Sequence, residues 1–301
     1  MSIVQLHRHA RVIGRGTRAG VSIVAACVSV FIAPRPIGAQ APDVATIVAD
    51  TRSALGGDAR IANVKTLIAT GRTRQVRGDN LVPIEFEIQV QLPDRFARRD
   101  EFPAQDAGPA TSGFNGDALI QSPPPAAPPA RPGGPPPPTD AQRQAQQRAR
   151  VVALKQDFAR LMLGMFGTSS TAYPLTFAYA GQAEAPQGKA HVLEGTAADE
   201  FKIRMFIDAQ THLPLMVAWQ QSAQAPRGGG PPPAIRPADG RANAPAAAEH
   251  RLYFADYRDV DGLKLPFRLR HAVGADTIEE TTFDRFRINA RVDPKRFDPA
   301  P

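Results

Sequence analysis

Four histidines beyond the N-terminal segment are the side chains best suited to acid–base or metal chemistry: His191, His212, His250 and His271. Each stands apart from any second ligand type at the spacing of a known metal site. His271 falls on the apolar phase of an expected strand, where a single histidine is more often a packed core residue than a base. The histidines therefore predict no catalytic centre and no metal.

The acidic residues also predict no catalytic or metal site. Glu85 and Glu87 share the polar phase of one expected strand, where solvation explains them. The run at 256–262, DYRDVDG, has spaced aspartates but lacks the full ligand series and the closing glutamate of a calcium loop. No phosphate-binding glycine loop and no Gly-x-Ser-x-Gly motif occurs in the sequence. We expect a protein without catalysis or cofactor, although carboxylates brought together by the fold would leave a hydrolase open.

The first 40 residues have the pattern of an export signal. Their start is basic, and residues 20–33 form an apolar run that is shorter than the about 20 residues needed to span a membrane. Small residues follow, so that cleavage after Ala39 or after Ala41 is open. We expect residues 1–40 to be a cleaved signal peptide and the mature protein to be periplasmic; a retained membrane anchor is the alternative.

Cys27, the only cysteine in the chain, allows a further alternative. Together with Val24, Ala25 and Ala26 it resembles a bacterial lipobox, in which the cysteine is lipidated and becomes the first mature residue. The residues that follow stay apolar, whereas a lipoprotein normally continues with a polar tether. Anchoring at Cys27 is therefore the minor alternative, and no disulfide is expected.

The net charge of +7 belongs mostly to the N-terminal segment. Five of the 36 Lys and Arg residues, and none of the 29 Asp and Glu residues, precede Asp43; 31 basic against 29 acidic residues leave +2. A nucleic-acid-binding domain would keep a basic stripe in its folded part. The composition therefore argues against nucleic acid as a partner.

Alternating apolar and polar residues predict strands with one apolar face. The clearest run is 84–92, IEFEIQVQL. Further strands are expected at 65–75, 95–102, 190–195, 201–207, 213–219, 251–257, 263–270 and 276–288. The last of these is mostly polar, which favours a position at an edge of the sheet. A solvated second face favours an antiparallel sheet over a parallel one.

Helices are expected at Asp43–Leu55 and at about Asp140–Met165. Asp43 and Thr139 are suitable N-caps, and Gly56-Gly57 follows the first helix. The second helix has apolar residues at helical spacing only in its later part, so we expect it to begin in solvent and to dock further along.

Two segments rich in Pro, Gly and Ala, 122–138 and 223–248, have few apolar side chains to offset the entropy of ordering. We expect disordered loops, with proline-rich recognition as the alternative. Strands with the same alternating pattern are expected on both sides of each loop, so we expect residues 41–301 to form a single domain.

Short motifs follow one another in a characteristic order. They are Ala54-Leu55-Gly56-Gly57, Thr66-Leu67 with Gly71, Pro93-Asp94-Arg95-Phe96, Gly113-Phe114-Asn115-Gly116, Ile207-Asp208 to Leu213-Pro214-Leu215, Tyr257 to Gly262 with Leu265-Pro266, and Val292-Asp293-Pro294 with Phe297. In these parts the chain resembles the outer-membrane lipoprotein-sorting proteins, which share the LolA/LolB-like fold of periplasmic lipoprotein and lipid carriers. The resemblance implies an α+β fold: a strongly curved antiparallel sheet, an unclosed half-barrel, covered by two or three helices. It also implies a hydrophobic cavity between sheet and helices in which acyl chains bind.

Strand and helix phase select eight candidate residues for the lining of that cavity. They are Phe86, Ile88, Phe158, Met162, Met205, Val217, Trp219 and Phe267. The same residues would also suit an ordinary core. The expected function is a monomeric carrier that binds a lipid or an acylated lipoprotein. The alternative is a lipid-sensing or protein-interaction domain of the same fold that acts on a transport or regulatory protein of the envelope.

Overall fold

The protein is described by a computed structural model that covers residues 42–78, 80–103, 108–124, 138–185, 188–221 and 248–299. The expected signal peptide, the lipobox-like Cys27 and nearly all of both proline-rich segments lie outside these residues. The described residues all belong to one compact unit.

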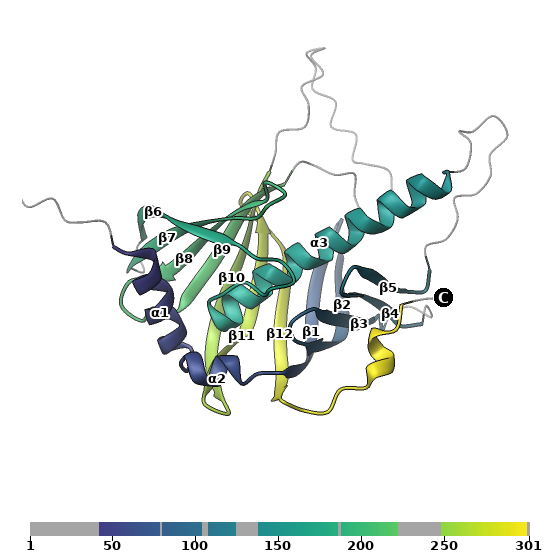
Figure 1. The fold of residues 1–301 in the computed structure, drawn as a ribbon, viewed down its shortest axis with the longest axis horizontal. Helices are drawn as coiled ribbons and strands as arrows, with labels where there is room; N and C mark the ends of the chain where they lie inside the picture. Colours follow the sequence, from purple (N-terminus) through teal and green to yellow (C-terminus); the bar gives the residue numbers. More distant parts are fainter. Residues whose placement is uncertain are drawn as a thin grey trace, which may run out of the picture. The chain divides into compact units, whose positions relative to one another are not determined.

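One antiparallel sheet of twelve strands dominates the described residues (Figure 1). Its order is β5-β4-β3-β2-β1-β12-β11-β10-β9-β8-β7-β6. The strands are β1 Thr66–Arg77, β2 Asn80–Gln91, β3 Arg95–Glu101, β4 Ala110–Asn115, β5 Ala118–Ser122, β6 Thr176–Ala185, β7 Gly188–Thr196, β8 Lys202–Asp208, β9 Pro214–Gln221, β10 Ala248–Val260, β11 Leu263–Val273 and β12 Asp276–Ile288. Because β5 and β6 do not pair with each other, the sheet is unclosed, as expected.

The expectation that 276–288 is an edge strand is wrong. This segment is β12, which pairs with β1 on one side and β11 on the other. Glu280, Thr282 and Asp284 face away from the helix layer, while Thr281, Phe283 and Phe286 are buried. A central strand tolerates many polar residues when one face of the sheet is open to solvent.

Three helices accompany the sheet: α1 Val44–Ala54, α2 Asp58–Ala62 and α3 Asp140–Phe166. Thr139 forms a capping box with Gln142 at the start of α3, and Gly167 ends the helix with a φ of 63°. Figure 1 shows α3 crossing one face of the sheet, which we call the inner face, whereas α1 lies beside β6. Within the described residues no helix is both long and apolar enough to cross a membrane.

The core lies between the inner face and α3. On β2 the residues Phe86, Ile88 and Val90 are buried, while Glu85 on the outer face is exposed. Buried side chains form two clusters under α3, and Tyr257 and Leu269 pack against both. The two clusters therefore make one continuous apolar layer.

The structure also differs from the expected alternation at the start of β9. Alternation along the expected strand 213–219 predicts that Leu215 faces inward with Val217, but it is 39% exposed. The pairing of β8 with β9 shifts register between Phe206 and Ile207. A register shift of this kind moves the residues beyond it out of phase, so Leu215 lies on the outer face.

Candidate functional site

The eight predicted cavity residues all lie in the layer between the inner face and α3. Their exposed fractions range from 0% at Val217 to 7% at Phe267. Phe86, Ile88, Phe158, Met162 and Phe267 belong to the cluster under the middle of α3, and Met205, Val217 and Trp219 belong to the second cluster. The structure brings the eight together as a packed layer. That they line a ligand cavity stays a prediction.

The polar contacts that hold α3 over this layer differ between its two ends. Toward the N-terminal end, Lys155 donates to Asp117 over 2.7 Å and Arg150 donates to Gln121 over 2.8 Å. Both contacts lie at the surface, Asp117 being 96% exposed, and surface contacts of this kind contribute about 0–1 kcal/mol each. The polar side of the helix is therefore weakly attached to β5 and the adjoining turn.

Near its C-terminal end, α3 approaches the sheet more closely. The hydroxyl of Tyr257 lies 2.9 Å from the carbonyl oxygen of Gly164 and 3.0 Å from that of Pro214. Burial raises the pKa of Tyr257 well above its usual value, so the hydroxyl remains a donor. A Cβ on Gly164 would stand 2.1 Å from the ring of Phe254. Only glycine allows this approach, and this end is the firm attachment of α3.

A buried arginine on α3 meets an aromatic group of the sheet. The guanidinium of Arg160 lies 4.0 Å from the ring centroid of Trp219 and 4.9 Å from that of Phe201. The rings of His250 and His271 pack on the same tryptophan, each with a centroid separation of 5.3 Å. His250 Nδ1 and His271 Nε2 are 3.1 Å apart.

The environment keeps both histidines neutral. Burial, together with the charges of His250 and Arg160, lowers the pKa of His271 to about 4. Burial and Arg160 also lower the pKa of His250. The spacing of these two histidines in the sequence did not predict that they meet. A hairpin that turns at Asp261-Gly262 brings them together, because it places position 250 diagonally across from position 271; Asp-Gly between two alternating segments is a sequence signal for such a hairpin.

Polar side chains extend from these histidines along the inner face. His271 is the register partner of Glu279 on β12, which accepts a hydrogen bond from Gln75 over 3.2 Å. Burial raises the pKa of Glu279. Thr73 and Thr281 follow, with their hydroxyls 2.9 Å apart. We call His250, His271, Gln75, Glu279, Thr73 and Thr281 the polar strip. It borders the apolar layer.

The polar strip offers donors and acceptors, but it does not form a metal site. Among the residues that the structure describes, no three His, Cys, Asp or Glu side chains are placed to hold a metal ion. Arg98 extends the strip, donating to Thr73 over 3.2 Å and pairing with Asp100 over 2.7 Å. Such a border beside an apolar layer can hydrogen-bond the polar end of an amphipathic molecule.

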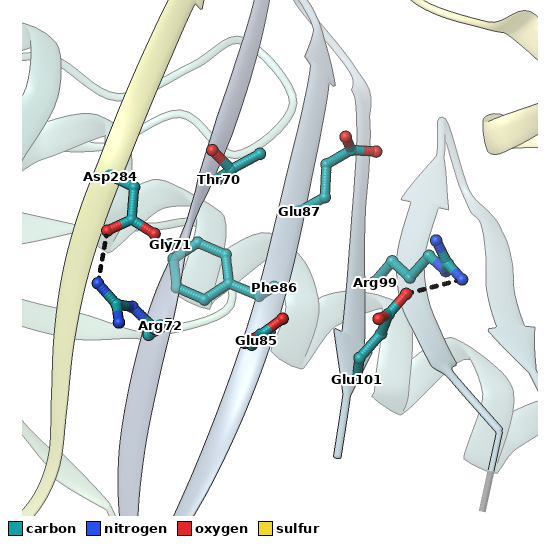
Figure 2. A pocket seen from close by; sticks show the side chains of 9 residues that line it. All are labelled: Thr70, Gly71, Arg72, Glu85, Phe86, Glu87, Arg99, Glu101 and Asp284. Atoms are coloured by element: carbon teal, nitrogen blue, oxygen red, sulfur yellow. Dashed lines mark hydrogen bonds and ion pairs between the residues drawn. The ribbon is translucent and has the colours of Figure 1, made fainter. Parts of the chain in front are cut away.

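A shallow pocket of about 410 Å³ lies on the outer face over β1, β2 and β3 (Figure 2). Figure 2 shows the ion pairs Arg72–Asp284, at 3.2 Å, and Arg99–Glu101, at 2.8 Å. Of the eight predicted residues Phe86 borders this pocket, but its side chain is buried against Phe283 in the core. Exposed pairs of this kind contribute little. Six of the nine lining residues are charged, which does not suit an acyl chain.

A second pocket on the outer face measures about 690 Å³. Its lining residues come from β6 to β12, and Phe206, Met216 and Tyr253 form the apolar part. It lies on the opposite side of the sheet from the eight predicted residues.

No protein-family model and no curated protein matches the sequence. Among solved structures, the chain is similar to a LolA superfamily protein from Nitrosomonas europaea, with a TM-score of 0.50 and 10% identity over 85% of this chain and 98% of that one. It is also similar to a putative outer membrane lipoprotein-sorting protein domain from Vibrio parahaemolyticus, with a TM-score of 0.45 and 11% identity over 84% and 95% of the two chains. A DUF1329 family protein from Desulfovibrio piger matches with a TM-score of 0.45 and 8% identity over 85% and 98%. The chain thus has a LolA-like α+β fold, as the sequence motifs predicted.

Proposed function

We propose that the protein is a periplasmic carrier that binds the acyl chain of a lipid or a lipoprotein between the inner face and α3, without catalysis. The observation that carries the proposal is the continuous apolar layer under a single covering helix. Its two clusters meet at Tyr257 and Leu269. The LolA-like fold supports the same role.

The composition of the layer suits a ligand of variable shape. Met162, Met165 and Met205 lie in it beside several phenylalanines. Methionine side chains are unbranched and repack readily around different partners. Burial of about twelve methylenes at about 0.8 kcal/mol each would release about 10 kcal/mol before the cost of moving α3 is deducted.

The attachment of α3 indicates how a chain would enter. The polar contacts of Lys155 and Arg150 are exposed, whereas Gly164 is packed against Phe254 and bonded to Tyr257. The helix should therefore lift first at its polar end. This movement would separate Phe158 from Phe96 and Phe114, whose ring centroids lie 5.3 and 5.6 Å away.

The polar strip would receive the other end of the ligand. Its threonines, Gln75 and neutral histidines can donate and accept hydrogen bonds, and Glu279, whose pKa is raised by burial, is the acidic group among them. A head group bonded there would leave the acyl chain pointing into the apolar layer. The export signal expected in residues 1–40 supports a periplasmic location.

The proposal is tested by purifying the protein from a bacterial periplasm and recording native mass spectra before and after solvent extraction. A bound acyl species that extraction removes is the expected result. Transfer of that species to acceptor vesicles would separate a carrier from a sensor, because a sensor retains its ligand. A protein that is empty and takes up no fatty acid or lipopeptide would contradict the proposal.

A further inference from the structure

The larger outer-face pocket is a groove that crosses the strands. Its lining includes residues on β6 and on β12, which are six strand spacings apart in the sheet order. At about 4.8 Å per spacing, this corresponds to about 29 Å along the sheet. A volume of about 690 Å³ spread over that length describes a long, narrow space, suited to an extended chain.

The course of β9 and β10 explains why the groove exists. Pairing of these strands ends at Met216 and Tyr253, and beyond this point β10 has a residue with positive φ, Asp256, at 57°. Beyond Tyr253, β10 continues to Val260 without pairing with β9. Small side chains deepen the outer surface on either side of the opening, at Ala183, Ala190 and Ala255.

The middle of the groove is apolar. Phe206 and Met216 are register partners on β8 and β9, and Met216 is in turn the partner of Tyr253 on β10. These three side chains are half-buried and form a row across three neighbouring strands. Leu215, which the register shift turns outward, adds to the row with 39% of its surface exposed.

One end of the groove is cationic. Arg268 and Arg270 line it on β11, and the guanidinium of Arg270 lies 4.2 Å from the ring centroid of Tyr253. Within the described stretches neither arginine has a carboxylate oxygen within 4 Å. Two acids lie nearby: Glu280, the register partner of Arg270, also lines the groove, and the charge of Arg268 helps to lower the pKa of Asp256.

The acids at the other end of the groove are already engaged. Asp208 accepts hydrogen bonds from the backbone of Gln210 and Thr211, and Glu184 pairs with Lys189 at 4.0 Å. An anion would therefore be attracted to the β11 end rather than to the β6 end. Guanidinium groups suit carboxylates and phosphates in particular, because they can bond both oxygens of the group.

We infer that this groove is a second binding site, for a single-chain amphiphile with an anionic head. The head binds at Arg268 and Arg270, and the chain lies across Tyr253, Met216 and Phe206. The site lies on the opposite face of the sheet from the proposed inner site and does not depend on it.

The test uses ω-bromoundecanoate, whose bromine quenches the fluorescence of an indole that it touches. Trp219 is the only tryptophan in the chain and reports on the inner layer. A double variant, Trp219→Phe with Phe206→Trp, moves the indole to the outer groove. Circular dichroism and urea unfolding establish that the variant folds like the parent.

Saturable quenching of the indole introduced at position 206 is the expected result. Met216→Glu in the same background should weaken this binding by about tenfold or more, because it places a carboxylate in the path of the chain. The matched control is Leu81→Glu, also on a strand of the sheet but outside the groove, where the side chain is 65% exposed; it should leave binding unchanged.

The head group is tested by replacing Arg268 and Arg270 with glutamine. Binding of ω-bromoundecanoate should weaken by about tenfold, since charge-assisted hydrogen bonds are lost. Binding of ω-bromoundecanol, which lacks the anionic head, should hardly change. Equal losses for the two probes would overturn the assignment of the head.

The quenching experiments can contradict either proposed site without contradicting the other. Quenching of Trp219 without quenching at position 206 would overturn the outer groove and leave the inner site intact. Quenching at position 206 alone would support the groove and contradict the proposed function. Quenching at position 206 that Met216→Glu leaves unchanged would overturn the groove as the place of binding.

Discussion

The histidine pair on the inner face predicts a loss of stability in mild acid. An unfolded histidine has a pKa of about 6.5, whereas His271 in the folded protein has a pKa of about 4. Between these pH values His271 is protonated in the unfolded chain but not in the folded protein. Stability is therefore fully present above pH 6.5 and falls as the pH decreases toward 4.

The magnitude follows from the difference between the two pKa values. Each unit corresponds to about 1.4 kcal/mol, so the free energy of unfolding should fall by about 2 kcal/mol between pH 7 and pH 5 and by about 3 kcal/mol in total. His250, whose pKa is also lowered, acts in the same direction. Glu279 acts in the opposite direction, because its raised pKa makes its contribution larger in acid.

The assay is urea unfolding at several pH values between 7 and 4.5, for the parent protein and for His271→Gln. Glutamine keeps a hydrogen-bond donor and acceptor near His250 but does not titrate, so the variant should lose most of the pH dependence above pH 5. His212→Gln is the matched control and should retain it. An unchanged slope in His271→Gln would refute the argument, as would an imidazole of His271 that NMR shows to be protonated at pH 6.

Three other substitutions test the attachment of α3. Gly164→Ala should lower the free energy of unfolding by about 1–3 kcal/mol, because the new Cβ would stand 2.1 Å from the ring of Phe254; a neutral effect in urea unfolding would mean that the helix is not held so closely. Tyr257→Phe should cost about 1–3 kcal/mol in the same assay, since the carbonyls of Gly164 and Pro214 lose the single hydroxyl donor that they share, and an unchanged midpoint would contradict this role. Lys155→Ala should cost less than about 1 kcal/mol but speed the uptake of fatty acid in stopped-flow measurements, because it removes the contact with Asp117; slower uptake would contradict opening at that end.

Helices and strands with a clear local pattern of apolar residues or a capping residue were predictable from the sequence. β2 alternates along its length, so its inner row was correct, and the capping residues Asp43 and Thr139 fixed the starts of α1 and α3. By contrast β4, β5 and β6 were not predicted as strands, because short or alanine- and glycine-rich segments such as 176–185 carry little periodicity. Their pairing with neighbouring strands stabilises them.

Contacts between segments that are far apart in the sequence were harder to predict. β12 is polar in sequence and became a central strand because β1 and β11, from opposite ends of the chain, both pair with it. The contact of Arg160 with Trp219 likewise depends on where α3 crosses the sheet. Strand and helix phase placed all eight predicted residues in the inner layer. It carried no information on the outer groove, which opens where the β8–β9 register shifts and the β9–β10 pairing ends.

Quenching of Trp219 fluorescence tests the central claim most directly. The tryptophan is 6% exposed, lies in the apolar layer and is unique in the chain. If an acyl chain enters between the inner face and α3, ω-bromoundecanoate should quench this indole saturably, and an unlabelled fatty acid should reverse the quenching by competition. Emission that stays unchanged while equilibrium dialysis shows the probe bound would contradict the claim, because the ligand would then lie outside the inner layer.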